Sequence, residues 1–141
     1  MLTYPLIHPG ILAALAGAGH GSQVLLVDGN YPVATAVHPR AAVVHLNLRP
    51  GTVDVETVLA TLLTAIPVEA AHVMAPGSGP EPEIFGTFRG HLPGVELAHL
   101  DRAGFYTAAR GEDVSLVVAT GEERLFANIL LTIGVVQGEH P

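Results

Sequence analysis

Apolar positions along the chain predict strands that alternate with helices. The segment 23–27 is continuously apolar after Gln23, which is typical of a strand buried on both faces of a sheet. The segment 42–48 alternates between apolar and polar residues enough to be a second strand. Four more segments are expected to be strands, at 68–74, 95–100, 114–120 and 129–135.

Helices are expected between these strands because their start and stop signals are present. Pro9 suits a first helical position and Gly17 an end, so a short helix is expected before the first strand. Further helices are expected over 53–66, capped by Thr52, over 81–92, and over 102–110, capped by Asp101. Strands alternating with helices predict a sheet covered on both faces, and therefore one three-layer α/β/α domain spanning residues 1–141.

The composition excludes several classes of protein. The chain has no cysteine, so it holds neither a disulfide framework nor a thiolate site. Its six basic residues are scattered arginines in a chain of net charge −7, which argues against binding to nucleic acid. No apolar run approaches the roughly 20 residues of a membrane helix, and no Lys or Arg before Arg40 forms the positive region of an export signal. We therefore expect a cytoplasmic protein with no membrane partner.

The balance of charged and apolar residues points to self-association. Charged residues make up only 13% of the chain, whereas hydrophobic residues make up 49%. So low a charged fraction indicates that other subunits cover part of the apolar surface. A coding bias toward Ala, Val, Gly, Pro and Arg would give the same composition, so both explanations stay open.

Two stretches place reactive polar residues among glycines and strand formers, where a packed core has no use for them. The first is Gly19-His20-Gly21, followed by Asp28 at the end of a strand, and the second is Thr120-Gly121-Glu122, followed by Asn128. The glycines on both sides of His20 let a ligand approach its ring closely. Because an imidazole gives and takes protons near neutral pH, His20 is the candidate general acid and base.

The order of these residues resembles that of a known family. Over almost its whole length the chain shows, in order, Gly19-His20-Gly21, Asp28, Arg102 before Phe105-Tyr106, Thr120-Gly121-Glu122, Phe126-Ala127-Asn128 and Gly134-Val135. In this order and spacing it resembles the ribose pyranase and fucose mutarotase family (RbsD/FucU). The resemblance implies an isomerase that interconverts the anomers of a free monosaccharide by opening and closing its ring, with no metal or organic cofactor.

The resemblance also implies roles for individual residues. The family histidine that matches His20 is the proton donor, and the aspartate that matches Asp28 binds sugar. A Tyr-(Gly/Ala)-Asn tripeptide lines the family pocket; here it is Phe126-Ala127-Asn128, so one phenolic hydroxyl is missing and Phe126 is expected to form an apolar wall. Arg102 is expected to contact sugar hydroxyls. The fucose branch of the family also has arginine at this position, whereas the ribose branch differs. L-Fucose is therefore the expected sugar, and D-ribose pyranase activity is the alternative.

His20 and Asp28 are expected at opposite ends of the first strand. At about 3.3 Å per residue they are separated by roughly 20 Å or more. One chain then does not bring them together, so we expect a pocket between subunits, with His20 contributed by a neighbouring chain. The family resemblance implies the same arrangement, as a ring-like homo-oligomer, a decamer of two stacked pentamers.

Each candidate also has a purely structural interpretation. His20 can end a helix, and Asp28 can form a turn ahead of Gly29. Arg102 can be solvated, Asn128 can bond backbone at a strand start, and Glu122 can tie down the amide groups of a turn. The histidines at 8, 38, 45, 72, 91, 99 and 140 lack the spacing of metal ligands, and Ser22 and Ser78 lack the setting of a nucleophile. A rival function from another class is a non-catalytic sugar-binding ring.

Overall fold

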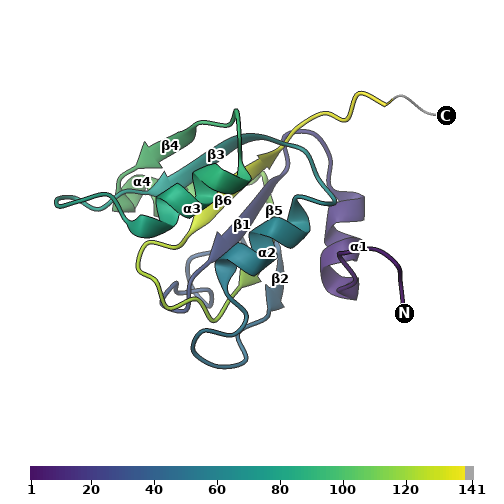
Figure 1. Ribbon diagram of the computed structural model, residues 1–141, viewed down its shortest axis with the longest axis horizontal. Helices are drawn as coiled ribbons and strands as arrows, with labels where there is room; N and C mark the ends of the chain where they lie inside the picture. The colour runs from purple at the N-terminus through teal and green to yellow at the C-terminus, as the bar shows by residue number, and fades with distance from the viewer. Residues whose placement is uncertain (139–141) are drawn as a thin grey trace.

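The computed structural model describes residues 1–138 as one mixed sheet with helices on its faces (Figure 1). Most elements begin or end a few residues inside the segments predicted from the sequence, because the ends of those segments form turns. The elements are α1 (Pro9–Gly17), β1 (Gln23–Val27), β2 (Ala42–His45), α2 (Val55–Leu62), β3 (Val68–Met74), α3 (Glu83–His91), β4 (Leu97–Leu100), α4 (Arg102–Ala109), β5 (Val114–Ala119) and β6 (Ile129–Ile133).

The sheet has the strand order β2-β5-β1-β6-β3-β4. Its strands run parallel except β6, which is antiparallel to both of its neighbours, β1 and β3. Figure 1 shows β1 and β6 pointing in opposite directions. The ends of β1 to β5 and the start of β6 therefore lie at one edge of the sheet, which we call the carboxyl edge. The starts of β1 to β5 and the end of β6 lie at the opposite edge, the amino edge.

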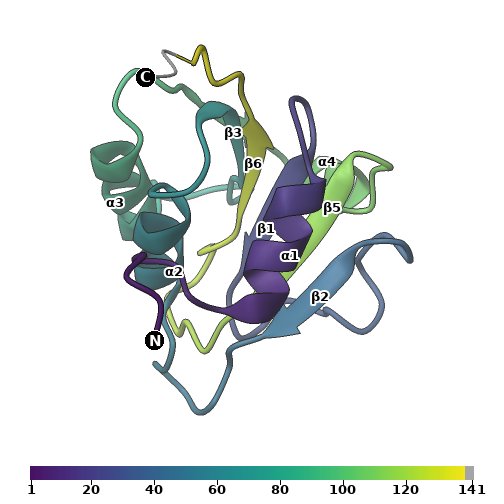
Figure 2. The same ribbon diagram turned by 90° about the vertical axis from the view of Figure 1, so that its right-hand side faces the viewer.

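The two faces of the sheet are covered by different elements. The alternation of β1 buries Val24 and Leu26 against α1, α2 and α3, while Leu25 and Val27 face α4 and the segment 31–37. Figure 2 shows α2 and α3 on one side of the sheet and α4 on the other. The predicted three-layer α/β/α architecture is thus confirmed.

The predicted start of α2 is wrong by two residues. Asp54, not Thr52, caps this helix, and its carboxylate accepts a hydrogen bond from the backbone N–H of Thr57 at 2.8 Å. Thr52 lies in a tight turn in which its N–H donates to the carbonyl of Arg49 and its carbonyl accepts from Leu48. Because Thr52 is held in that turn, the helix begins only at Val55 and ends at Leu62.

Candidate functional site

Asp28 follows β1 directly and is buried at the carboxyl edge. Its carboxylate accepts hydrogen bonds from the backbone N–H of Asn30 at 3.0 Å and from the side-chain amide of Asn128 at 3.2 Å. The side-chain carbonyl of Asn128 accepts in turn from the backbone N–H of Asp28 at 2.9 Å. Asn128 immediately precedes β6, the antiparallel neighbour of β1, so the sheet topology joins two residues that are far apart in the sequence.

The environment of Asp28 changes its acidity. Burial raises the pKa of the Asp28 carboxyl above its ordinary value, and hydrogen bonds from the Asn30 and Ala127 backbone and the Asn128 side chain offset part of this rise. A partly desolvated carboxylate with fixed partners is a strong acceptor for hydroxyl groups. Asp28 is therefore suited to hold a polyhydroxylated ligand.

The stretch Thr120-Gly121-Glu122 supports the Asp28 loop from the neighbouring strand β5. The Thr120 hydroxyl donates to the carbonyl of Val27 at 2.7 Å, and the Glu122 carbonyl accepts from the N–H of Gly29 at 2.9 Å. At Gly121 a Cβ atom would lie 2.5 Å from the Arg49 carbonyl oxygen, so only glycine fits at this close approach of two loops. These contacts fix the backbone on both sides of Asp28.

The Glu122 carboxylate is buried and fully engaged. It accepts hydrogen bonds from the backbone N–H of Val55 at 3.2 Å and from the backbone N–H of Arg124 at 2.9 Å. The Arg124 guanidinium donates two more, each at 2.9 Å. Glu122 thus ties the start of α2 to the loop that leads to Asn128, which confirms the structural interpretation of its carboxylate.

Replacing Glu122 by glutamine tests this buried ion pair through pH. Burial alone would raise the pKa of Glu122, but the hydrogen bonds from Arg124 and the backbone hold it below its ordinary value of 4.5. The stabilisation by Glu122 is therefore present above about pH 4.5 and is lost as the pH falls through the lowered pKa. At neutral pH the variant Glu122→Gln is expected to be about 1–3 kcal/mol less stable than the wild type.

Urea unfolding from pH 7 to pH 3 measures this difference. The gap between the wild type and Glu122→Gln should narrow below about pH 4.5. A gap that stays constant over the whole range would show that the charge of Glu122 contributes nothing to folding.

Arg102 is the first residue of α4, shortly after the end of β4 at the carboxyl edge. There its guanidinium lies beside a pair of tyrosine rings. Its guanidinium lies 5.7 Å from the centre of the Tyr106 ring, and the Tyr106 and Tyr31 rings lie 5.4 Å apart. The hydroxyl of buried Tyr31 donates to the carbonyl of Ala36 at 2.6 Å, and burial raises its pKa to about 12. The Tyr31 hydroxyl proton is therefore used within its own loop.

Phe126 and Ala127 point in different directions. Phe126 is half-buried, with a φ of 59° in the left-handed region that non-glycine residues rarely adopt. The side chain of Ala127 is buried in the core beneath α2 and α3. The half-buried Phe126 ring packs against both hydrophobic clusters and lines the cavity, while Ala127 contributes through its backbone.

One cavity of about 130 Å³ unites most of the residues singled out from the sequence. Asp28, Arg102, Phe126 and Asn128 all line it, whereas Ala127 and His20 do not. Tyr31 and Tyr106, the two tyrosines that the sequence offers in place of the hydroxyl absent at Phe126, also line the cavity. Asn30, Met74 and Leu125 complete the lining and were not predicted. Met74 ends β3, and Asn30 lies shortly after the end of β1. Because ligands bind at the carboxyl ends of parallel strands, these positions could have predicted that both residues line the site. The cavity is small beside the roughly 300–1,000 Å³ of drug-sized ligand pockets, as suits a monosaccharide.

His20 lies elsewhere, in the turn between α1 and β1 at the amino edge. Its side chain is 58% exposed, and Nε2 lies 3.0 Å from both carboxylate oxygens of Glu69. The whole length of β1, roughly 13 Å at about 3.3 Å per residue, separates this turn from Asp28. The structure therefore confirms that the two residues lie at opposite ends of the strand.

Residues 1–138 contain neither a metal-binding cluster nor a membrane-spanning helix. Within this range no three His, Cys, Asp or Glu side chains come together in a way that could hold a metal ion. None of the helices formed by these residues is long and apolar enough to cross a membrane.

The chain is similar to known proteins over nearly its whole length. Residues 1–136 match the model of the RbsD / FucU transport protein family. D-ribose pyranase 2 of Streptomyces griseus is 34% identical over 89% of this chain and 91% of its own length. The fucose mutarotase of Streptococcus pneumoniae, solved with L-fucose, aligns at a TM-score of 0.81 with 31% identity, over 96% of this chain and 99% of its own. Bacillus subtilis RbsD, solved with D-ribose, aligns at a TM-score of 0.83 with 23% identity, over 96% and 99%, and shows the same fold.

Proposed function

Because the chain belongs to the RbsD/FucU family, we propose that it is a sugar mutarotase of the L-fucose type. It interconverts the anomers of a free monosaccharide by opening and closing the ring. One observation carries the proposal: a single small cavity collects the carboxylate of Asp28, the amide of Asn128 and the guanidinium of Arg102. Together these groups accept from and donate to neighbouring hydroxyls, as recognition of a sugar requires.

The proposed reaction moves only protons and one carbon–oxygen bond. The anomeric hydroxyl loses its proton, its oxygen becomes the aldehyde oxygen, and the bond between the anomeric carbon and the ring oxygen breaks. The ring oxygen gains a proton to become a free hydroxyl. His20 takes the first proton and supplies the second, and after rotation of the aldehyde the reverse steps close the ring on its other face. Asp28, Asn128 and Arg102 hold the remaining hydroxyls in place.

The site is proposed to form between two subunits. His20 is exposed at the amino edge, while the sugar cavity lies at the carboxyl edge of the same chain. A neighbouring copy that sets its amino edge against this cavity supplies the missing imidazole. A closed ring of such head-to-tail contacts gives every subunit one complete site, as in the proposed decamer of two stacked pentamers.

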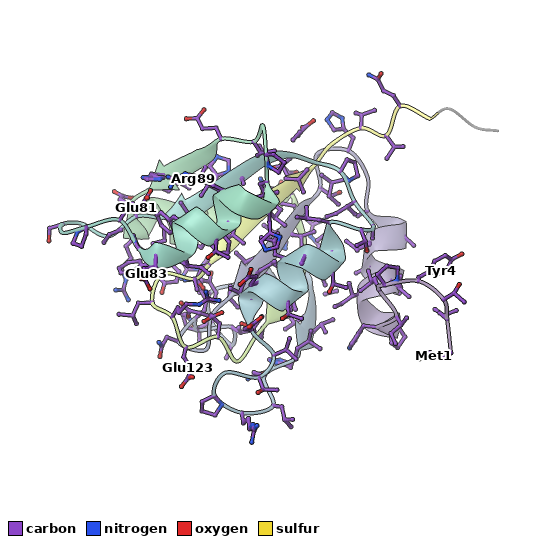
Figure 3. All side chains as sticks on the ribbon, viewed as in Figure 1. Met1, Tyr4, Glu81, Glu83, Arg89 and Glu123 are labelled. Atoms are coloured by element: carbon purple, nitrogen blue, oxygen red, sulfur yellow. The ribbon has the colours of Figure 1, made fainter. Side chains whose placement is uncertain are left out.

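Exposed apolar side chains at both edges support this contact. Leu125 is 68% exposed and lines the cavity, while Val135 and Val136 follow β6 at the amino edge and are also exposed. Met1 and Tyr4 project from the N-terminal segment away from the sheet (Figure 3). Apolar side chains at the two edges that would meet are expected where copies of the chain associate. A second copy of this chain is the occupant we propose.

The cavity lining supports L-fucose as the sugar. L-Fucose carries a methyl group on its ring, and Met74, Leu125 and Phe126 offer an apolar wall beside the polar groups. D-Ribose has no such methyl group. The similarity to the S. griseus D-ribose pyranase makes ribose the second candidate, for which the same ring opening would exchange the six-membered and five-membered rings.

Saturation-transfer NMR on equilibrium mixtures of L-fucose and D-ribose tests the proposal. With L-fucose, saturating the signal of one anomer is expected to reduce the signal of the other when the protein is added. Enhanced exchange between ring sizes of D-ribose alone would establish the pyranase instead. Broadened sugar signals without enhanced exchange of either sugar would establish a non-catalytic binding ring and contradict the proposal.

A further inference from the structure

A second hollow, of about 440 Å³, lies beside the sugar cavity at the carboxyl edge, and we call it the polar groove. Its walls come from Asn47, Arg49 and Pro50, which follow β2, and from residues 120–123, which follow β5. Asn30 lines both the polar groove and the sugar cavity. The two hollows therefore adjoin each other at this residue.

The strand order places the two hollows on opposite sides of β1. The polar groove lies where β2 and β5 end, and these strands are on one side of β1. The sugar cavity reaches the other way, to Met74 at the end of β3 and to Arg102 at the start of α4. Leu125, the exposed residue proposed to contact a neighbouring subunit, also lines the cavity and not the groove. A ligand seated at Asp28 thus has room to extend toward β5 and β2.

Two glycines fix the base of the polar groove. A Cβ atom at Gly29 would lie 3.2 Å from the carbonyl oxygen of Glu122, and one at Gly121 would lie 2.5 Å from that of Arg49. The N–H of Gly121 also donates to the carbonyl of Val53 at 2.8 Å. The loops after β1, β2 and β5 therefore approach closely enough to hold one another in place, because neither glycine carries a side chain. The groove is held in shape by the protein itself.

The side chains of the groove suit a neutral ligand that is rich in hydroxyl groups. Asn30 and Asn47 carry amides that both donate and accept, Arg49 donates, and Glu123, which projects at this edge, accepts (Figure 3). All four residues are exposed, and within residues 1–138 neither Arg49 nor Glu123 has an ion-pair partner within 4.0 Å. Because the groove holds one charge of each sign, it favours neither a phosphate nor an ammonium group. Pro50 adds an apolar surface for the face of a sugar ring.

We propose that the polar groove binds a second sugar unit, so that the substrates include reducing disaccharides. The inference rests on the proposed function and defines its substrate class more closely. The reducing unit occupies the cavity at Asp28, and the unit linked to it lies in the groove beyond Asn30. Ring opening changes only the anomeric carbon, its hydroxyl and the ring oxygen. A substituent on another hydroxyl therefore leaves the reaction unchanged, and the glycosidic bond stays intact.

Exchange between the anomers of synthetic disaccharides tests this inference. The reducing unit is L-fucose or D-ribose, whichever the wild type exchanges as a free sugar, and D-galactose is linked in turn to each of its hydroxyls other than the anomeric one. Saturation-transfer NMR is expected to show accelerated exchange for at least one linkage. Because the groove adds hydrogen bonds, the KM for that disaccharide should be about 3- to 10-fold lower than the KM for the free sugar.

Substitutions in the groove separate the second unit from the first. Arg49→Ala and Asn47→Ala should each raise the KM for the accepted disaccharide about 3- to 10-fold and leave exchange of the free sugar unchanged. Both side chains are exposed, so the melting temperatures should stay near that of the wild type. Arg40→Ala is the matched control, because Arg40 is equally exposed but precedes β2 at the amino edge. It should exchange both sugars as the wild type does.

The outcomes distinguish this inference from the proposed function. If the wild type exchanges the free sugar but accelerates none of the disaccharides, the second sugar unit is overturned and the proposed function stands. The same holds if a disaccharide is accelerated but Arg49→Ala and Asn47→Ala both keep the wild-type KM for it. If neither L-fucose nor D-ribose is exchanged as a free sugar, the proposed function is overturned, and this inference with it.

Discussion

His20→Ala is expected to remove sugar ring opening while leaving the fold and the assembly intact. A positioned acid and base contributes on the order of 10²- to 10⁴-fold to proton-transfer reactions, so exchange should fall toward the spontaneous rate. The His20 side chain is exposed, and among residues 1–138 it forms an ion pair only with Glu69, so little folding energy is lost. Saturation-transfer NMR gives the exchange rate, and light scattering gives the size of the assembly.

The matched control for this variant is His45→Ala, which removes an exposed histidine from the edge strand β2. It should leave the exchange rate at the wild-type level. If His20→Ala exchanged sugar as fast as the wild type, the imidazole would have no catalytic part.

Asp28→Asn is expected to cause the second large effect, on sugar affinity. The substitution keeps the shape of the side chain but replaces a charged acceptor, whose hydrogen bonds contribute roughly 1.5–3 kcal/mol each. The loss of one such bond corresponds to about 10- to 100-fold weaker binding. Titration calorimetry with the preferred sugar measures this change. Asp113→Asn, an exposed aspartate ahead of β5, is the control and should bind normally.

The folding stability of Asp28→Asn relative to the wild type is expected to change with pH in the opposite direction to that of Glu122→Gln. Because burial raises the pKa of Asp28, its charge destabilises the folded state above that raised pKa, and this cost disappears as the pH falls to about 3.8. The wild type should therefore gain stability relative to Asp28→Asn as the pH is lowered through that range. A stability difference independent of pH would contradict the buried, ionised state of Asp28.

The sequence was sufficient to predict the helices and strands, but not the order of the strands in the sheet. The apolar run of β1 predicted a strand buried on both faces, and Val24 to Val27 are fully covered. The antiparallel position of β6 between β1 and β3 depends on long-range pairing, which local pattern does not encode. The wrong helix start at Thr52 has a similar cause, because the turn with Arg49 is stabilised by the loop around Gly121.

In the candidate site, too, some residues could be identified from the sequence and others only from the fold. Asp28 and Asn128 were identified by their polarity beside apolar strands, and the structure joins them in a reciprocal hydrogen-bonded pair. Glu69 could not be found in this way, because a charged residue at the start of a strand is unremarkable until the sheet order is known. Its contact with His20 depends on β6 lying between the two segments that carry them.

The central claim is that one chain supplies His20 and another supplies Asp28. It is tested most directly by mixing two impaired variants and measuring exchange at a sugar concentration too low to fill the weakened Asp28→Asn site. His20→Ala and Asp28→Asn are unfolded together at equal amounts and refolded, and native mass spectrometry confirms that mixed assemblies form. With sites shared between subunits, random assembly makes about one site in four from two intact contributors, so about a quarter of the wild-type activity should return. Mixed assemblies no more active than the two parent variants would contradict the claim.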